Sequence, residues 1–368
     1  MLFGLGEAGR EVLKIFFISK RYYTNKDLLK DRFGRLYHLP IELHRREADV
    51  FVAAIDYKNA CGETIEAEGV RFYTIPARAT KLLGLPVNLF REALAVAPDI
   101  IIASGDSHIG YVSLKIANWI GARFIYDVYD YYPIFLSNRI PGMKSMFCWA
   151  VKKADLVLCA SKPLQHRLSN LNPHTLLIEN GVDRTLFKPG AMNQAREKLG
   201  FKQNIPLIGY FGSITATRGP LLIDACKKLR DEMPTLQLVL AGRVSNVSIE
   251  QPWINYLGEV PQRSIPALIQ ACNVVTVPYA GDTFNSMAGA CKIAEYLACG
   301  RPVVATRVSG HEQIFESVPR ALCDPNPCDM ARALRSQLTN DEVVPFPTSM
   351  DWSYIGGTLY QSINDIAG

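Results

Sequence analysis

The sequence lacks the features that mark membrane-spanning, secreted or zinc-binding proteins. Among its 368 residues no apolar run reaches the roughly 18 residues that a membrane-spanning helix requires. The amino-terminal segment has no continuous signal-peptide core. Nine cysteines occur without a C-x2-C pair, and no Asp-x-Asp metal motif is present. Many of the cysteines lie in apolar strand or helix patterns, as buried reduced thiols would, so we expect a cytoplasmic protein in which any membrane contact is peripheral. We expect no metal site and no cofactor.

The charge of the chain is mildly basic and unevenly distributed. The net charge is +5, and 25 of the 40 Lys and Arg residues but 19 of the 35 Asp and Glu residues lie in residues 1–188. A basic first half fits an anionic acceptor or the inner face of a membrane, and it fits equally a solvated helical face. Basic residues do not gather with aromatic residues into one patch, so we do not expect a nucleic-acid partner.

The stretch from Val274 to Thr306 organises the rest of the sequence. Its ends, Val274–Pro278 and Pro302–Ala305, are short β-branched runs typical of buried parallel strands. Between them Met287–Cys299 predicts a helix that ends at Gly300. The stretch therefore predicts a strand–helix–strand unit.

Lys292 and Glu295 are three residues apart in this expected helix, so they share one of its faces. An ammonium group suits phosphate oxygens, and a carboxylate suits ribose hydroxyls. An ordinary surface ion pair is the alternative interpretation.

The run PYAGDTFNSMAGACKIAEYLACGRPVVAT resembles the donor-nucleotide segment of GT-B glycosyltransferases. The resemblance is to the large retaining, family 4-like group of bacterial envelope and exopolysaccharide enzymes. There a Glu, seven residues and a second Glu precede a run ending in Gly-x-Pro-Val-Val. Glu295 matches the second Glu, which holds the ribose, whereas Met287 stands at the first, which grips the donor sugar. The arrangement also resembles the xanthan glucuronosyltransferase, in which a lysine at the position of Lys292 meets the diphosphate.

Candidates for the acceptor side follow the expected strands of the first half. In GT-B enzymes a glycine-rich loop after the first strand faces the cleft between the domains, and here Gly34 stands in that loop. The strand Asp99–Ser104 leads into Asp106 and His108, and ligands in open α/β sheets gather at the carboxyl ends of strands. A helix N-cap role for Asp106 or Ser107 is the competing explanation.

The segment ARFIYDVYDYYP supplies the candidate catalytic acid. Alternation in Arg123–Tyr129 predicts a strand, whose interior holds Asp127 and whose carboxyl end exits at Asp130. The segment resembles an Asp-x-x-Asp-x-x-Pro run of the same glycosyltransferases. We assign Asp130 as the catalytic carboxylate, either as the base of an inverting reaction or as a group that orients the acceptor and stabilises positive charge in a retaining one. A helix cap or an ion pair is the alternative.

The second half adds candidates for the diphosphate and the base. Gly212 allows a tight turn after the strand Leu207–Phe211, and Arg218 precedes a helix that starts near Pro220. A local cap or salt bridge is the other interpretation of Arg218. Arg243 follows another strand into the same cleft.

A second glycine segment of this half resembles the family motif Leu-Gly-x-Val, whose backbone meets the base. That resemblance makes Gly258, Glu259 and Val260 candidates for the base pocket. Near the amino terminus, Gly4, Gly6 and Gly9 form a Gly-x-Gly-x-x-Gly pattern, but only three residues precede it, so we expect no dinucleotide site there.

The sequence as a whole predicts an α/β protein of GT-B fold with two Rossmann-like domains. We expect an acceptor domain at residues 1–187, a nucleotide-sugar domain at 188–349 and a terminal helix at 350–368 that packs back on the first domain. The segment KLLGLPVNLFREAL is amphipathic with a basic edge, which fits lipid headgroups or packing on its own sheet.

The resemblance implies a metal-independent glycosyltransferase that moves a sugar from a nucleotide sugar to a glycan or lipid-linked acceptor in envelope or exopolysaccharide synthesis. The alternatives are a GT-B-type nucleotide-sugar epimerase and a catalytically silent sugar-nucleotide-binding subunit.

Overall fold

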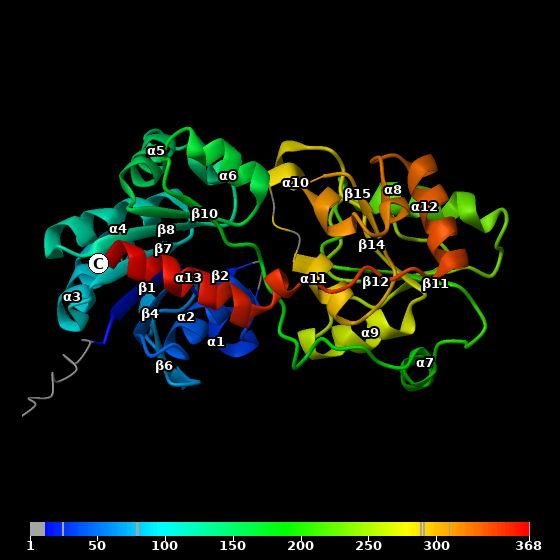
Figure 1. Ribbon diagram of the computed structural model, residues 1–368, viewed down its shortest axis with the longest axis horizontal. Helices are drawn as coiled ribbons and strands as arrows, with labels where there is room; N and C mark the ends of the chain where they lie inside the picture. Colours follow the sequence, from blue (N-terminus) through cyan, green and yellow to red (C-terminus); the bar gives the residue numbers. More distant parts are fainter. Residues whose placement is uncertain are drawn as a thin grey trace, which may run out of the picture.

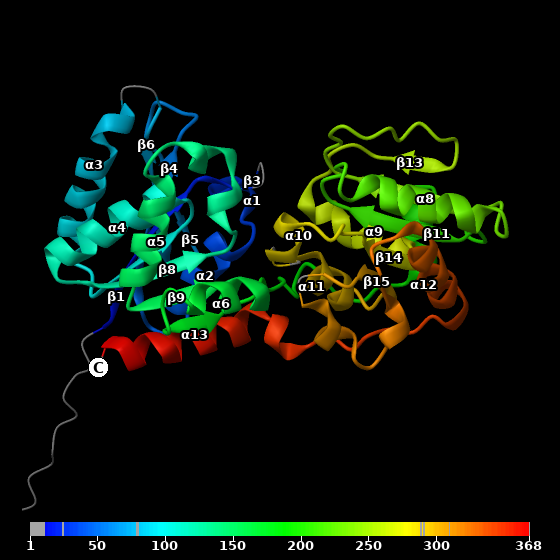
Figure 2. The ribbon, with the colours of Figure 1, turned by 90° about the horizontal axis from the view of Figure 1, so that it is seen from above.

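The chain forms two lobes that lie side by side, each built on a mainly or wholly parallel sheet covered by helices (Figures 1 and 2). The structure, a computed structural model, describes residues 12–23, 26–78, 81–287, 289, 291–308 and 310–367. The glycine pattern of Gly4, Gly6 and Gly9 lies outside these residues. Within them, no helix combines the length and the apolar character needed to cross a membrane.

The first lobe contains an eight-stranded sheet in which every pairing is parallel except that of the edge strand β5 with β6. Its central strands are β-branched and aromatic runs buried on both faces, as parallel sheets require. Listed in spatial order, the strands are β10 (Thr175–Leu177), β9 (Leu156–Cys159), β8 (Arg123–Val128), β7 (Ile100–Ser104), β1 (Lys14–Lys20), β4 (Asp49–Asp56), β6 (Val70–Pro76) and β5 (Thr64–Ala67).

Helices and turns connect these strands on both faces of the first sheet. A small hairpin follows β1 directly, and two 3-10 turns follow β8. These elements are β2 (Tyr22–Tyr23), β3 (Lys26–Asp27), α1 (Leu28–Asp31), α2 (Arg35–His44), α3 (Lys81–Val96), α4 (Ser107–Ile120), η1 (Tyr132–Ile134), η2 (Leu136–Arg139), α5 (Met143–Lys153) and α6 (Lys162–Ser169).

The second lobe contains a wholly parallel six-stranded sheet. In spatial order its strands are β13 (Ile254–Tyr256), β12 (Gln237–Ala241), β11 (Leu207–Phe211), β14 (Val274–Val277), β15 (Val303–Thr306) and β16 (Leu322–Cys323). Its helices are α7 (Met192–Leu199), α8 (Gly219–Arg230), α9 (Ile265–Ala271), α10 (Thr283–Met287), α11 (Cys291–Ala298) and α12 (Pro327–Asn340). The predicted α/β architecture of alternating strands and helices is thus confirmed.

The helix predicted at Met287–Cys299 is wrong in its first turn. Met287 ends the short helix α10, and α11 begins at Cys291. The Met287 carbonyl accepts a hydrogen bond from the Ser161 hydroxyl at 2.8 Å, across the boundary between the lobes. A contact with the other lobe therefore takes the place of helix propagation at this position.

The terminal helix α13 (Trp352–Ala367) runs along the first lobe and packs against α2 (Figure 1). The ring of Trp352 stacks on His38 with 5.1 Å between centroids. Gly356 and Gly357 lie inside α13, which is continuous. Gly356 permits a close approach, since a Cβ there would collide with the Cβ of Glu42 on α2.

The two neighbouring glycines of α13 give a matched test of this packing. Gly356→Ala should destabilise the protein by roughly 1–3 kcal/mol, because the added methyl group overpacks the contact with α2. Gly357→Ala should be neutral or stabilise by up to about 1 kcal/mol, because its Cβ meets Arg46 no closer than 3.5 Å and alanine favours the helix. Urea unfolding measures both changes, and equal effects of the two substitutions would contradict the proposed contact.

Candidate functional site

The centre of the second sheet is a topological switch point. The chain proceeds from β11 outward through β12 and β13, and later from β14 outward in the opposite direction through β15 and β16. Open α/β sheets bind ligands in the crevice that this reversal leaves at the carboxyl ends of the central strands. Gly212 follows β11 at this point, and Tyr279 follows β14 by two residues.

Lys292 lies directly over Gly212. A Cβ at position 212 would collide with Cε of the lysine, so only glycine leaves room for this side chain. Burial opposes the charge on Lys292, but the oxygens of Tyr279 and Tyr210 and the Glu295 carboxylate together raise its pKa. The ammonium group is therefore held charged at the end of β11.

Arg218 lies within the electrostatic reach of Lys292 and is held by neighbouring side chains. Its guanidinium lies 4.3 Å from the ring centroid of Tyr279 and donates a hydrogen bond of 3.1 Å to Oδ1 of the fully buried Asn285. It occupies the N-cap position of α8 but makes no side-chain cap hydrogen bond. Arg218 is thus held by a neutral amide and an aromatic ring.

Glu295 follows one turn after Lys292 on α11. Burial raises the pKa of its carboxyl group to about 7, against the opposing effects of Lys292 and of Lys26. Lys26 belongs to the hairpin strand β3 of the first lobe. The basic loop after β1 therefore reaches the electrostatic environment of the second lobe, which the sequence alone did not indicate.

The first sheet has its own switch point, between β1 and β7. Lys20 at the end of β1 and Asp106 after β7 form an ion pair of 3.0 Å across it. Asp106 occupies the N-cap position of α4, but its side chain makes no cap hydrogen bond there. His108 pairs with the hydroxyl of Tyr57 at 2.7 Å, and burial lowers its pKa. Both predicted acceptor residues thus follow the carboxyl end of β7, where their partners Lys20 and Tyr57 come from the ends of β1 and β4.

Asp130 lies on the same side of the first sheet, two residues after β8. Burial raises the pKa of its carboxyl group to about 7, while Lys20 lowers that pKa and Asp106 raises it. Arg218 of the second lobe also lowers the pKa, so Asp130 lies within the electrostatic reach of that guanidinium. Among the described residues, no hydrogen bond or salt bridge to the Asp130 side chain is found, and the N-cap of η1 is Tyr131. Neither the cap nor the ion-pair interpretation of Asp130 is therefore supported.

Asp127, the other acid of the same segment, is structural. It receives two hydrogen bonds from Arg35, of 2.6 and 3.1 Å, and a third from Ser104. Arg35 also donates to the carbonyl of Ile178, and both members of this ion pair are almost fully buried. Sequence reasoning missed Arg35, because an arginine at the start of a helix ordinarily reads as a surface residue. Its only local signal is its position directly after Gly34.

Gly34 itself has φ +71° and caps α2. A Cβ at this position would meet no atom within 4 Å, so the backbone faces open space. Glycine is required here by the left-handed φ, not by a close neighbour.

The glycine turns that follow β11, β12 and β13 lie next to one another. The amide of Gly212 donates to the carbonyl of Ala241, and the amide of Gly242 donates to the carbonyl of Gly258. Val260 packs against the core of the lobe, whereas the side chain of Arg243 is exposed. The backbone of the base-pocket candidates is thus near Gly212, and the carbonyl of Arg243 accepts a hydrogen bond from the Ile214 amide.

Met287 is engaged with the first lobe. Its side chain packs against the core of the first lobe. The backbone of Gly289 also lies close to the first lobe, because a Cβ there would lie 2.7 Å from the carbonyl oxygen of Ala160. The position at which the resembled family carries an acid therefore serves as a contact between the lobes in this chain.

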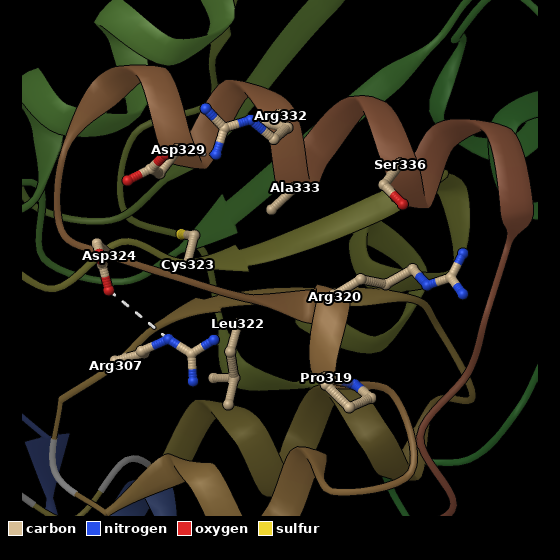
Figure 3. A pocket seen from close by; sticks show the side chains of 10 residues that line it. All are labelled: Arg307, Pro319, Arg320, Leu322, Cys323, Asp324, Asp329, Arg332, Ala333 and Ser336. Atoms are coloured by element: carbon tan, nitrogen blue, oxygen red, sulfur yellow. Dashed lines mark hydrogen bonds and ion pairs between the residues drawn. The ribbon is translucent and has the colours of Figure 1, made fainter.

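A cavity of about 490 Å³ lies elsewhere, at the outer edge of the second sheet between β16 and α12 (Figure 3). Three arginines line it, and each forms an ion pair with an acid: Arg307 with Asp324, Arg320 with Glu342 and Arg332 with Asp329. None of the predicted site residues lines it. Over the described part of the chain, no group of His, Cys, Asp or Glu side chains forms a candidate metal site.

Comparison with solved structures identifies the fold. Sucrose-phosphate synthase from Thermosynechococcus elongatus matches with a TM-score of 0.72 at 17% identity, covering 96% of this chain and 99% of that one. HepE of Anabaena in complex with UDP matches with a TM-score of 0.70 at 17% identity, covering 96% and 100%. The chain therefore has the GT-B fold, as the sequence predicted.

Comparison of sequences addresses the family. The model of the family described as "Glycosyl transferases group 1" matches residues 205–340, which is the second lobe. A protein of Methanocaldococcus jannaschii described as an uncharacterized glycosyltransferase is 24% identical over 241 residues, or 64% of each chain. The match thus spans less than two thirds of that relative. These findings support the predicted group of GT-B glycosyltransferases; the narrower resemblance to envelope enzymes and to the xanthan enzyme stays a prediction.

The raised pKa of Asp130 predicts a pH dependence of stability. Between about pH 4 and pH 7 the folded protein keeps a proton that the unfolded chain releases, so stability falls as the pH rises. Asp130→Asn removes this loss. We expect the variant to gain roughly 1–3 kcal/mol of unfolding free energy over the wild type between pH 5 and pH 8.

Urea unfolding at the two pH values measures this gain. Glu250→Gln, which changes an exposed carboxylate of the second lobe, is the control and should follow the wild type. A constant difference between Asp130→Asn and the wild type across the range would show that Asp130 titrates normally.

Proposed function

We propose that this protein is a glycosyltransferase that moves a sugar from a nucleotide diphosphate sugar to a hydroxyl group of an acceptor. One observation carries this proposal. Arg218, Lys292 and Glu295 lie together at the switch point of the second sheet, and Asp130 of the first lobe lies within the electrostatic reach of Arg218. Two cations beside an acid from the opposite lobe are what transfer from a diphosphate leaving group requires.

The proposed donor occupies the crevice of the second lobe. Lys292 and Arg218 bind the diphosphate and stabilise its negative charge as it leaves. Glu295 binds the ribose, and the backbone of the glycine turns around Gly258 borders the base. The structurally similar HepE of Anabaena forms complexes with UDP and with UDP-glucose. We therefore propose uridine diphosphate sugars as the first donors to test.

The proposed transfer step breaks the bond between the anomeric carbon and the diphosphate oxygen and forms one between that carbon and the acceptor oxygen. The electron pair of the broken bond leaves with the diphosphate. In an inverting course the Asp130 carboxylate takes the proton of the acceptor hydroxyl. In a retaining course it orients that hydroxyl and stabilises positive charge on the sugar. A pKa of about 7 suits a base that works near neutral pH.

The acceptor is proposed to bind at the first lobe, near Asp106 and His108, and to be a glycan or a lipid-linked sugar of envelope or exopolysaccharide synthesis. We propose a cytoplasmic protein with peripheral contact at the inner face of the membrane.

For the domains we propose that residues 1–187 bind the acceptor, that residues 188–349 bind the donor, and that residues 350–368 form a terminal helix that packs back on the first domain. The two sheets end and begin on either side of residue 188.

A catalytically silent sugar-nucleotide-binding subunit is the second candidate. Met287 favours it, because its apolar side chain is engaged with the first lobe at a position where the resembled enzymes place an acid. Donor binding without transfer would support that role, and turnover of the donor without any acceptor would indicate an epimerase.

Donor binding should depend on Lys292. A nucleotide sugar that binds the folded state raises the unfolding temperature, and Lys292→Ala should weaken binding roughly 10- to 100-fold, because a charge-assisted hydrogen bond is lost. Thermal unfolding against uridine, guanosine and adenosine diphosphate sugars measures this. Lys198→Ala, an exposed lysine of the same lobe, is the control.

A second variant tests whether donor binding depends on where the Lys292 ammonium group lies, and not only on whether it is present. Gly212→Ala keeps Lys292 but pushes its side chain out of place, so it should weaken donor binding in the same way. Binding at wild-type strength by both variants would refute the assigned diphosphate site.

Transfer should depend on Asp130 while donor binding does not. Asp130→Asn keeps the shape of the side chain but cannot take a proton, so kcat should fall by roughly 100-fold or more. The donor-induced rise in unfolding temperature should stay close to that of the wild type. Transfer to acceptor by this variant at the wild-type rate would remove Asp130 from the catalytic role.

A further inference from the structure

Helix α3 carries two apolar stripes, of which only one is buried. The buried stripe packs into the core of the first lobe and consists of Leu85, Leu89 and Ala93. The second stripe repeats at helical spacing on the opposite side, with exposed fractions of 87%, 52% and 55% for Leu83, Val87 and Leu94. An ordinary surface helix carries polar residues on that side.

The exposed apolar stripe continues beyond α3. The ring of Phe90 meets Trp119 of α4 edge-on at 5.7 Å, yet Trp119 remains 80% exposed. Helix α4 packs in turn against α5, and α5 packs against η1 and η2. Trp149 on α5 and Leu136 in η2 are exposed as well, at 48% and 73%. Figures 1 and 2 both show α3, α4 and α5 side by side on the first lobe.

The same three helices are strongly basic. Together α3, α4 and α5 hold one acidic residue, Glu92, and six basic ones: Lys81, Arg91, Lys115, Lys144, Lys152 and Lys153. Lys152 and Lys153 are exposed in the last turn of α5, and the ammonium group of Lys153 lies 5.7 Å from the ring centroid of Trp149. We call this surface the basic apolar face. It consists of these six basic residues and of the exposed apolar side chains Leu83, Val87, Leu94, Trp119, Leu136 and Trp149.

We propose that the basic apolar face docks on the surface of an anionic lipid bilayer. Exposed apolar side chains with tryptophan and lysine suit the boundary between acyl chains and headgroups. The charge argues for this occupant over a second copy of the chain, because joining two such faces would bring twelve cations and two acids together. An anionic surface satisfies the same charges.

This surface gives a place to the proposed lipid-linked acceptor, and in that respect it rests on the proposed function. The segment η1–η2 begins two residues after Asp130, and its exposed Leu136 belongs to the basic apolar face. A carrier lipid held at this face lies along the chain segment that leads to the candidate catalytic acid.

Flotation of the purified protein with vesicles tests the docking. Vesicles of phosphatidylcholine containing phosphatidylglycerol should bind the wild type roughly tenfold or more above pure phosphatidylcholine, and added salt should weaken this binding. Lys152→Glu/Lys153→Glu should weaken it by roughly 25-fold or more, since each lysine near an anionic surface contributes about a fivefold attraction. Leu83→Ser/Trp119→Ser should weaken it by roughly tenfold or more, because two exposed apolar anchors are lost.

A matched control keeps the test specific. Lys227→Glu/Lys228→Glu reverses an adjacent pair of exposed lysines in the last turns of α8, in the second lobe, and should bind vesicles like the wild type. Both charge reversals change the end of a helix in the same way, so thermal unfolding should show similar stability for the two variants.

Three outcomes would overturn the proposal. They are no binding of the wild type to the anionic vesicles, an equal loss in the α8 control, and a wild-type dimer in solution that Leu83→Ser/Trp119→Ser dissociates. Flotation needs no donor, acceptor or turnover. A protein that binds vesicles but transfers no sugar would therefore refute only the proposed function, and an active transferase that binds no vesicles would refute only the docking.

Discussion

The candidate site depends on the partial burial of charged side chains between the two lobes. Burial raises the pKa of Asp130 in one lobe and of Glu295 in the other to about 7. Burial opposes the charge of Lys292, but Tyr279, Tyr210 and Glu295 raise its pKa, so it remains charged. Partly buried charges of this kind cost stability unless a ligand or a neighbour compensates them. Their concentration at one boundary is therefore an argument for a ligand with complementary charges.

The best-paired buried charges of the first lobe do not belong to the candidate site. Arg35 and Asp127 form a bidentate, almost fully buried ion pair that also engages the carbonyl of Ile178. It ties α2 and β8 to the segment after β10. Asp127 is thus paired inside the scaffold, whereas no hydrogen bond to the Asp130 carboxylate is found among the described residues, so the two acids of one short segment differ in their environments. The difference comes from one position being inside the strand and the other beyond its end.

We propose that the first lobe carries two functional surfaces. Its strand ends face the second lobe, where Lys20, Asp106 and Asp130 interact. Its helices α3, α4 and α5 instead present apolar and basic side chains to the outside. The uneven charge of the sequence follows from this arrangement, because the helices of that face hold six of the basic residues and one acid. The segment from Asp130 through η2 joins the two surfaces.

The sequence by itself determined the parts of this protein that depend on neighbours along the chain. Buried β-branched runs, glycine turns and helix stops predicted most strands, the two α/β halves and the placement of Gly212, Lys292 and Glu295. Tertiary structure decided what depends on residues far apart: the pairing of Arg35 with Asp127, the approach of Lys26 to Glu295, the hold of Asn285 on Arg218 and the break in the helix after Met287. The physical reason is the separation along the chain over which each interaction acts. Local patterns fix backbone conformation, whereas burial and the charge state of a side chain are set by whichever distant segment packs against it.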